Sequence, residues 1–181
     1  MLPVPWVQRT IEYGRSLDEL PVLFERVQGT VSRVSAILSA QPVEKLHLQV
    51  HGKWSVMEHI GHLIALQDRF EGRLEDFENG RTSLCEISLH DQEAILNGHR
   101  LRALGDVLEE FRLKRMAFTQ RLSMFRQASL EHVAFHPCQN KRMRAVDMLL
   151  WIAEHDDHHL ASIRMIVQNT AAAPRPGLWP D

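Results

Sequence analysis

The sequence contains few of the features that define several classes of protein. Cysteine occurs only twice, at Cys85 and Cys138, with no CxxC pair, which excludes a framework of disulfides. The longest apolar runs, such as Met148 to Ala153, are far shorter than the roughly 20 residues that a membrane-spanning helix needs. The opening residues have neither a basic start nor a continuous apolar stretch, which argues against an export signal. We therefore expect a cytoplasmic protein that does not span a membrane.

Charge of either sign is not in excess, and this limits the partners. The formal net charge is −2 and the pI is about 6.6, so no basic surplus is available to bind nucleic acid or an anionic membrane surface. The hydrophobic fraction of 44% and the charged fraction of 24% are those of an ordinary globular protein. At 181 residues the chain is long enough for one well-buried core. We expect a single domain without a nucleic-acid or membrane partner.

Glycine and proline are sparse, and the chain contains four long segments of helical periodicity. Two of them begin with a capping-box pattern, "SLDE" at Ser16 and "SVME" at Ser55, in which serine and glutamate side chains can bond to each other's free backbone amides. The four predicted helices run from about Ser16 to Leu38, Ser55 to Asn79, Asp106 to Phe125 and Ala145 to Gln168. No segment indicates a strand, so the sequence predicts an all-α four-helix bundle.

Two further segments lack this periodicity. Residues 81–105, between the second and third predicted helices, are expected to form a loop with a short extra helix around "DQEAILNG". The final "TAAAPRPGLWPD" is rich in proline and alanine and is expected to be extended or disordered. The predicted organisation is therefore one bundle domain over residues 1–169, followed by a tail over residues 170–181.

The fourth predicted helix carries three histidines and three carboxylates in the string "EHDDHH". At about 100° per residue, His159 lies about 40° from His155 and inside the apolar stripe, whereas His158 lies about 60° further out. His155 and His159 thus face the core one turn apart, the spacing with which two imidazoles can share a cation. Two buried core histidines would give the same pattern, so the residues alone leave a structural and a metal-binding interpretation open.

A metal ion would need a third protein ligand, and the second predicted helix offers two histidines in "EHIGHL", His59 and His62. When His62 is placed at zero on a helical wheel, the apolar residues of this helix average near 90° and His59 lies at about 60°. His59 is therefore nearer the apolar stripe. Periodicity alone favours His59 as the third ligand, although the wheel does not separate the two cleanly.

The strings "WSVMEHIGHL", from Trp54 to Leu63, and "HDDHHL", from His155 to Leu160, resemble the motifs of the DinB/YfiT-like family, described as metal-dependent hydrolases. The family pattern is a tryptophan and a serine at the start of the second helix, a glutamate, a His-Leu pair, and a late His-x-x-His-His cluster. The resemblance implies an up-down-down-up four-helix bundle with the site in a cavity between helices. It also implies a homodimer, since dimers are common in the family.

Carried over by position, the metal ligands of the family fall on His62, His155 and His159. The resemblance thus favours His62 over His59, which becomes a core histidine or one that supports a ligand, and it makes His158 an edge residue beside a carboxylate. Many relatives carry glutamine three residues after the last ligand, where this chain has Ser162. This chain therefore lacks that amide.

Other residues near the motifs have both a functional and a simpler interpretation. Glu58, Asp156 and Asp157 are the nearest carboxylates in sequence to the proposed ligands. Any of them could orient a ligand ring, although a helix cap or a solvated charge is the simpler interpretation. The "HPC" string at His136 could bring a thiol near the cavity, and "KRMR" from Lys141 could bind an anion. A buried or idle loop cysteine and solvated basic residues are the favoured interpretations of these two strings.

Three imidazoles leave a coordination position open, as catalytic zinc sites do. Histidine ligation suits zinc or nickel best among the divalent metals. Such a metal lowers the pKa of a bound water or binds a thiol as thiolate. The resemblance therefore implies a hydrolase or a thiol S-transferase acting on a small-molecule substrate, with a low-molecular-weight thiol in the second case. Two hypotheses of other classes remain: a non-catalytic metal-binding or stress-associated protein, and purely structural histidines without metal.

Overall fold

The fold is described from a computed structural model, which places residues 4–49, 53–86, 98–99 and 102–169. The long helices that it defines are α1 (Leu20–Gln28), α2 (Thr30–Leu38), α4 (Val56–Glu78), α6 (Leu104–Ser123) and α8 (Ala145–Asn169). Two short helices, α3 (Val43–Leu46) and α7 (Gln127–Glu131), lie in the connections. The predicted extra helix lies almost entirely outside the described residues, as does the predicted C-terminal tail. Within the described part of the chain, no helix has the length and apolar character needed to cross a membrane.

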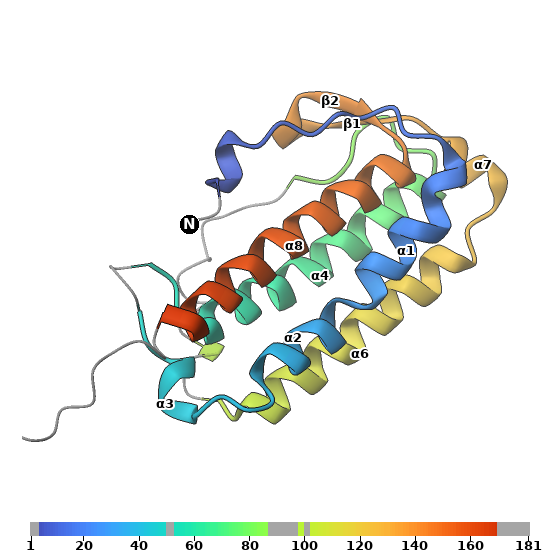
Figure 1. Cartoon of the computed structure of the whole chain (residues 1–181). Coiled ribbons are helices and arrows are strands. Elements are labelled where there is room, and N and C mark those ends of the chain that lie inside the picture. The colour runs from blue at the N-terminus through green and yellow to red at the C-terminus, as the bar shows by residue number, and fades with distance from the viewer. Residues whose placement is uncertain (1–3, 50–52, 87–97, 100–101, 170–181) are drawn as a thin grey trace, which may run out of the picture.

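The long helices form the predicted up-down-down-up bundle. α1 and α2 follow each other along one side, α4 and α6 both run in the opposite direction, and α8 returns in the direction of α1 and α2 (Figure 1). α4 packs against both α6 and α8, and the α1–α2 pair packs against the same two helices from the other side. Because α4 and α6 are parallel neighbours, the chain between them must cross the full length of the bundle, which explains the long connection over residues 79–103.

The predicted capping box at the start of α4 is confirmed. The Ser55 hydroxyl accepts a hydrogen bond from the Glu58 backbone N–H at 3.3 Å, and the Glu58 carboxylate accepts one from the Ser55 backbone N–H at 2.7 Å. Both amides would otherwise lack a partner in the first helical turn. The start of α4 is thereby fixed at Val56, three residues before His59 and six before His62.

The first predicted helix differs from the expectation in two ways. Ser16 and Glu19 form no capping box, because the Glu19 carboxylate pairs instead with the Arg15 guanidinium at 3.0 Å, and Ser16 caps only a single 3-10 turn, η2 (Leu17–Glu19). The helix is also divided at Gly29, between α1 and α2. Glycine lowers helix propensity by about 1 kcal/mol relative to alanine, so a break is least costly at this residue.

The prediction that the chain has no strand is wrong at one end of the bundle. β1 (Ala134–His136) and β2 (Lys141–Met143) form an antiparallel hairpin, joined by the 3-10 turn η3 (Pro137–Gln139) and by Asn140 in the left-handed conformation. Residues 82–84 lie beside β1, with backbone hydrogen bonds of 2.8 and 2.9 Å to Phe135. Strands of three residues are too short to show an alternating pattern. The hairpin covers the region where α4 ends and α8 begins (Figure 1).

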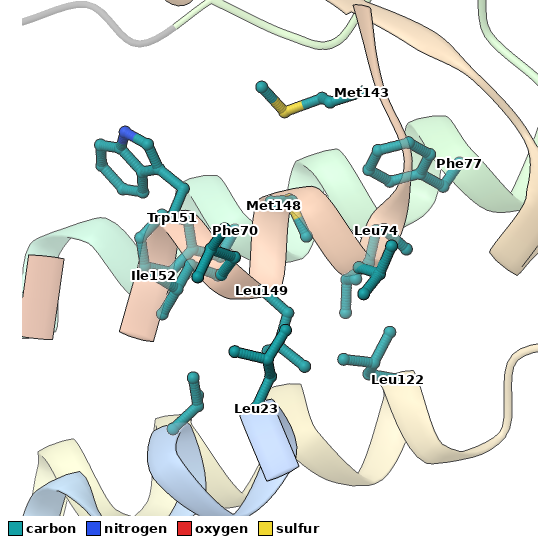
Figure 2. Close-up of a cluster of buried hydrophobic side chains, with 14 of the residues drawn as sticks. Leu23, Phe70, Leu74, Phe77, Leu122, Met143, Met148, Leu149, Trp151 and Ile152 are labelled. Carbon is teal, nitrogen blue, oxygen red and sulfur yellow. The ribbon is translucent and has the colours of Figure 1, made fainter. Parts of the chain in front are cut away.

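Two apolar clusters fill the interior of the bundle. The cluster nearer the hairpin contains side chains of α1, α4, α6 and α8, and Figure 2 shows part of it with ten residues labelled. They are Leu23, Phe70, Leu74, Phe77, Leu122, Met143, Met148, Leu149, Trp151 and Ile152. The second cluster lies toward the opposite end and includes Val34, Met57, Ile60, Ile64, Phe111 and Ile163. Neither cluster includes residues 154–159 of α8, the segment that carries the histidines.

A buried polar layer separates the two clusters. Each side of the bundle contributes one residue at this level: Thr30, Gln67, Arg115 and Asp156, none more than 2% exposed. The Arg115 guanidinium donates two hydrogen bonds to the Asp156 carboxylate, at 2.7 and 3.2 Å, and a third to the Gln67 side-chain oxygen at 3.0 Å. The Thr30 hydroxyl donates to Asp156 at 2.7 Å. Because all these groups are satisfied, the layer fixes the rotation of α8 relative to its neighbours.

The chain before α1 lies along α8 (Figure 1). The Asp147 carboxylate accepts the backbone N–H groups of Gly14 and Arg15 at 2.7 and 2.9 Å, and Arg9 pairs with Glu154 at 2.9 Å. These contacts hold the first 3-10 turn, η1 (Trp6–Gln8), beside the middle of α8. Trp6 is thereby brought to the histidine segment.

Candidate metal centre

Three histidines converge between α4 and α8. His62 is on α4, and His155 and His159 are one turn apart on α8. The Nε2 atom of His155 lies 3.3 Å from Nε2 of His62 and 3.2 Å from Nε2 of His159. One nitrogen from each ring lies within 4.8 Å of those of the other two. Among the described residues, this is the one group of three or more histidine, cysteine or acidic side chains that converges in this way.

The separations fit a tetrahedral metal ion. Zinc–nitrogen bonds of about 2.0–2.1 Å at tetrahedral angles place two ligand nitrogens about 3.3 Å apart. The two Nε2–Nε2 distances at His155 are 3.3 and 3.2 Å. Three unprotonated nitrogens that face one another repel unless a proton or a cation lies between them. The donor set therefore fits a divalent metal that accepts imidazole ligands.

His59 supports one of the three rings. Its Nδ1 atom lies 2.8 Å from Nδ1 of His159, so one of these two nitrogens donates a hydrogen bond to the other. If His159 donates, its proton is on Nδ1 and its Nε2 has the free lone pair that a metal requires. His59 is nearly buried, in agreement with its position on the wheel, but the structure places it behind His159 and does not direct it toward the converging nitrogens.

Three tryptophans surround the histidines. The Trp151 ring stacks on His155 with centroids 4.9 Å apart and an interplanar angle of 10°, and the Trp6 ring meets the same imidazole edge-on at 4.9 Å. The Trp54 ring lies 5.0 Å from His62 and 6.0 Å from His159. The Nδ1 atom of His155 is buried and has no hydrogen-bond partner among the described residues, so packing between tryptophans sets the orientation of this ring.

Burial keeps the clustered imidazoles neutral. Burial, followed by the nearby His62 and His158, lowers the pKa of His59 to about 3. Burial and the charge of Arg69 lower the pKa of His62 to about 4. The pKa values of His155 and His159 are also well below the usual range, mainly through burial and then through the other histidines. Because the neutral ring is the form that binds metal, the candidate ligands need not release protons at neutral pH.

These pKa values predict that the metal-free protein loses stability in acid. In the unfolded chain the histidines take up protons near their ordinary pKa of about 6.5, whereas in the folded chain His62 does so only near 4. Between these values the unfolded state binds more protons, so the free energy of unfolding falls as the pH decreases. We expect a loss on the order of 2 kcal/mol between pH 7.5 and 5 for each such histidine, measured by urea unfolding of chelator-treated protein. A His62→Phe variant should lose less, and an equal loss in that variant would contradict the assignment.

The other residues predicted near the site have different positions. Glu58 caps α4 and accepts hydrogen bonds from the Gln49 amide at 2.9 and 3.0 Å. The expectation that Asp156 orients a ligand ring does not match the structure, because its carboxylate points into the polar layer and pairs with Arg115. Asp157 pairs with Arg26 and Arg33, at 2.5 and 2.6 Å. These two carboxylates therefore anchor α8 to other helices.

His158 and Ser162 lie at the edge of the cluster. The His158 ring contacts the rings of Trp6 and His159, with centroid distances of 5.8 and 5.5 Å, and no carboxylate bond to it is found among the described residues. The Ser162 hydroxyl, at the position where many relatives carry glutamine, donates to the His158 carbonyl at 3.0 Å. Ser162 thus satisfies its own helix and extends no polar group toward the three histidines.

Sequence reasoning missed two contributors to the site. Trp6 lies in a segment without periodicity, and no sequence signal places it beside His155. Arg115 had a signal, because it follows Phe111 by four residues and precedes Phe118 by three, which puts a charge on the apolar face of α6. A charged residue at a core position indicates a buried partner.

With the helical bundle and the three converging histidines described, the comparisons with known proteins identify the family. The DinB superfamily model matches residues 26–163, a range that contains His62, His155 and His159. The chain belongs to the DinB superfamily.

One solved structure shows the same fold at low sequence identity. It is YfiT from Bacillus subtilis, described as a probable metal-dependent hydrolase with an unusual four-helix bundle topology. The two structures agree with a TM-score of 0.77 over 91% of this chain and 95% of YfiT, at 13% sequence identity. No curated protein sequence matches the chain. The predicted four-helix bundle and the predicted family are both confirmed.

Proposed function

We propose that the chain is a metal-dependent enzyme, a hydrolase or a thiol S-transferase, whose divalent metal is bound by His62, His155 and His159. The observation that carries the proposal is the convergence of these three Nε2 atoms at spacings of 3.2 and 3.3 Å, which suit zinc or nickel. Membership of the DinB superfamily and the fold shared with YfiT support it. The position of His62 in the cluster also supports the assignment that the family resemblance favours over His59.

The residues of the chain prepare the site in three ways. The imidazoles are neutral at neutral pH and so can bind a cation without losing a proton. His59 bonds to the far nitrogen of His159, and Trp151 stacks on His155, so two of the three rings are held in place. The bound metal would supply a Lewis acid that lowers the pKa of a water or thiol in its remaining position. Three protein ligands leave that position open.

The surroundings of the cluster favour a small, largely apolar substrate. Trp6 packs against His155, Trp54 packs against His62, and both tryptophans are partly exposed. Aromatic walls bind apolar surface and add little charge recognition. The His62 residue is also partly exposed, so one edge of the cluster borders the surface of the bundle. A substrate would therefore approach between the two tryptophans.

The test is the metal content of the protein, followed by its activity. Protein purified without chelator or affinity-tag metal should contain about one equivalent of a divalent ion per chain by elemental analysis. Turnover of a model electrophile only with added thiol would identify a transferase, and turnover without thiol would identify a hydrolase. Metal without turnover would favour the alternative, a non-catalytic metal-binding or stress-associated protein. A metal content below about a tenth of an equivalent per chain, after the protein is incubated with metal and dialysed, would contradict the proposal.

Two further properties belong to this proposal. We propose that the enzyme acts in the cytoplasm, because the two cysteines are free thiols. We also propose a homodimer, as the family resemblance implies. Light scattering in solution would show a mass near twice 20.9 kDa if the dimer forms.

A further inference from the structure

A second polar cluster lies beneath the β1–β2 hairpin, away from the histidine centre. It contains Arg73 of α4, which is fully buried, and His136 at the end of β1, which is 2% exposed. Arg73 follows His62 by 11 positions on the same helix, a rise of about 16 Å. Neither residue contributes to the proposed metal centre, so the cluster needs an explanation of its own.

The buried groups of this cluster are hydrogen-bond donors without acceptors. None of the three nitrogens of the Arg73 guanidinium has a hydrogen-bond partner among the described residues. The Nδ1 atom of His136 accepts the backbone N–H of Gln139 at 3.2 Å, so the ring proton of the neutral imidazole is on Nε2. That Nε2 is also buried and without a partner. An unpaired guanidinium and an unpaired N–H in the same region are rare in folded proteins, because each costs several kcal/mol.

The charged and polar neighbours do not neutralise Arg73. Asp76 is one turn further along α4, but its carboxylate accepts the Cys85 backbone N–H at 2.6 Å and makes no ion pair with Arg73. The Cys85 sulfur lies close to Gly72, and burial and Asp76 raise the pKa of this thiol, which keeps it uncharged at neutral pH. Arg73 is five residues before the end of α4 and His136 is the last residue of β1, so both lie at the end of the bundle that the hairpin covers. Burial, followed by the charge of Arg73, lowers the pKa of His136 to about 4.

We propose that Arg73 and His136 form a binding site for a small oxyanion, either a carboxylate or inorganic phosphate, beneath the β1–β2 hairpin. A planar guanidinium pairs with two oxygens of such an anion at once, and the His136 N–H can donate to the same anion. The cover is small, since each strand of the hairpin has three residues. Short hairpins open at low cost, so an anion can enter without unfolding the bundle.

The test measures the melting temperature of chelator-treated protein against anion concentration. Wild-type protein, Arg73→Met and the matched surface control Arg121→Met are titrated with inorganic phosphate and, separately, with formate, at constant ionic strength set by sodium gluconate. We expect a saturable rise of roughly 5–10 °C at a hundredfold excess over the dissociation constant. The rise should be absent in Arg73→Met and retained in Arg121→Met. The anion that raises the melting temperature at the lower concentration shows whether the site prefers phosphate or a carboxylate.

Several results would contradict the proposed anion site. One is a response that is the same in wild-type and Arg73→Met protein, since excluded salts stabilise most proteins without binding. Another is a rise in melting temperature with chloride equal to that with phosphate or formate, which would show that the protein does not prefer an oxyanion. A third is a response that appears only after the substitutions Cys85→Ser and Cys138→Ser. That result would mean that a cysteine thiolate is the counter-ion of Arg73 in the wild-type protein. His136→Phe keeps the charge of Arg73 and should weaken anion binding, and it replaces Arg73→Met if that variant does not fold.

Discussion

Replacing His62 by alanine should remove nearly all of the divalent metal that the wild-type protein retains. The substitution takes away one of three converging nitrogens, 3.3 Å from that of His155, and two imidazoles of one helix remain. We expect the metal affinity to fall by more than the roughly 10–100-fold that is typical when a residue supporting a ligand is lost. Elemental analysis after dialysis and a competition titration with a zinc chelator measure the two quantities.

His59→Ala is the matched control, since it removes a histidine of the same helix that contacts His159 without facing the other rings. The loss of the 2.8 Å contact frees the His159 ring to rotate, and we expect a reduction of about 10–100-fold with metal still bound. Both variants must show the helical circular dichroism and the thermal transition of folded protein. If His59→Ala loses metal and His62→Ala does not, the proposed ligand set is wrong, and the third ligand is His59, as helical periodicity favours.

Arg115→Met should be among the most destabilising single substitutions in the bundle. It leaves the fully buried Asp156 carboxylate with only the Thr30 hydroxyl as a side-chain partner, and it removes the donor to Gln67. Breaking one side of a buried ion pair costs about 3–5 kcal/mol. Urea unfolding should show this loss, together with a melting temperature lower by roughly 6–20 °C. The partly exposed pair that Arg121 makes with Glu71 gives the control, and Arg121→Met should cost no more than about 1 kcal/mol.

A double variant separates the lost pairing from a general packing defect. In Arg115→Met with Asp156→Leu, both charges are replaced by apolar side chains of similar size, and such exchanges are often neutral or stabilising. We expect most of the stability to return. The double variant should nevertheless bind metal less tightly than wild type, because the polar layer no longer fixes the rotation of α8 that presents His155. A double variant as unstable as Arg115→Met alone would mean that packing, and not the uncompensated carboxylate, causes the loss.

The sequence predicted those parts of the fold that depend on local and repetitive signals. The Ser55 cap and the apolar period placed α4 and α8 within a residue or two of their observed bounds. The break at Gly29 was missed because a single glycine within a strong helical pattern is tolerated often enough to be overlooked. The hairpin was missed because each of its strands has only three residues. The other segment beside β1, residues 82–84, lies about 50 positions earlier in the sequence, where no local pattern can indicate the pairing.

The candidate site was predictable only in part. The spacing of His155 and His159 on one face of a helix follows from helical geometry, and the structure places both in the cluster. The third histidine does not follow from periodicity, because the converging nitrogens lie at the margin of the core and the more central His59 lies behind them. The family resemblance named His62, since a motif records position directly. Neither helical periodicity nor the family motif predicts tertiary contacts such as that of Trp6 with His155.

The segment that carries Trp6 has a consequence for how such a protein can diversify. The family model matches residues 26–163, which include the three converging histidines, while Trp6 and the contacts of Arg9, Gly14 and Arg15 lie before that range. The three converging histidines and one of the tryptophans beside them are thus encoded in separate stretches of the gene. Mutations in the leading stretch can change the surroundings of His155 without disturbing the bundle that holds the histidines. The histidine cluster and its aromatic surroundings are therefore free to evolve at different rates in this chain.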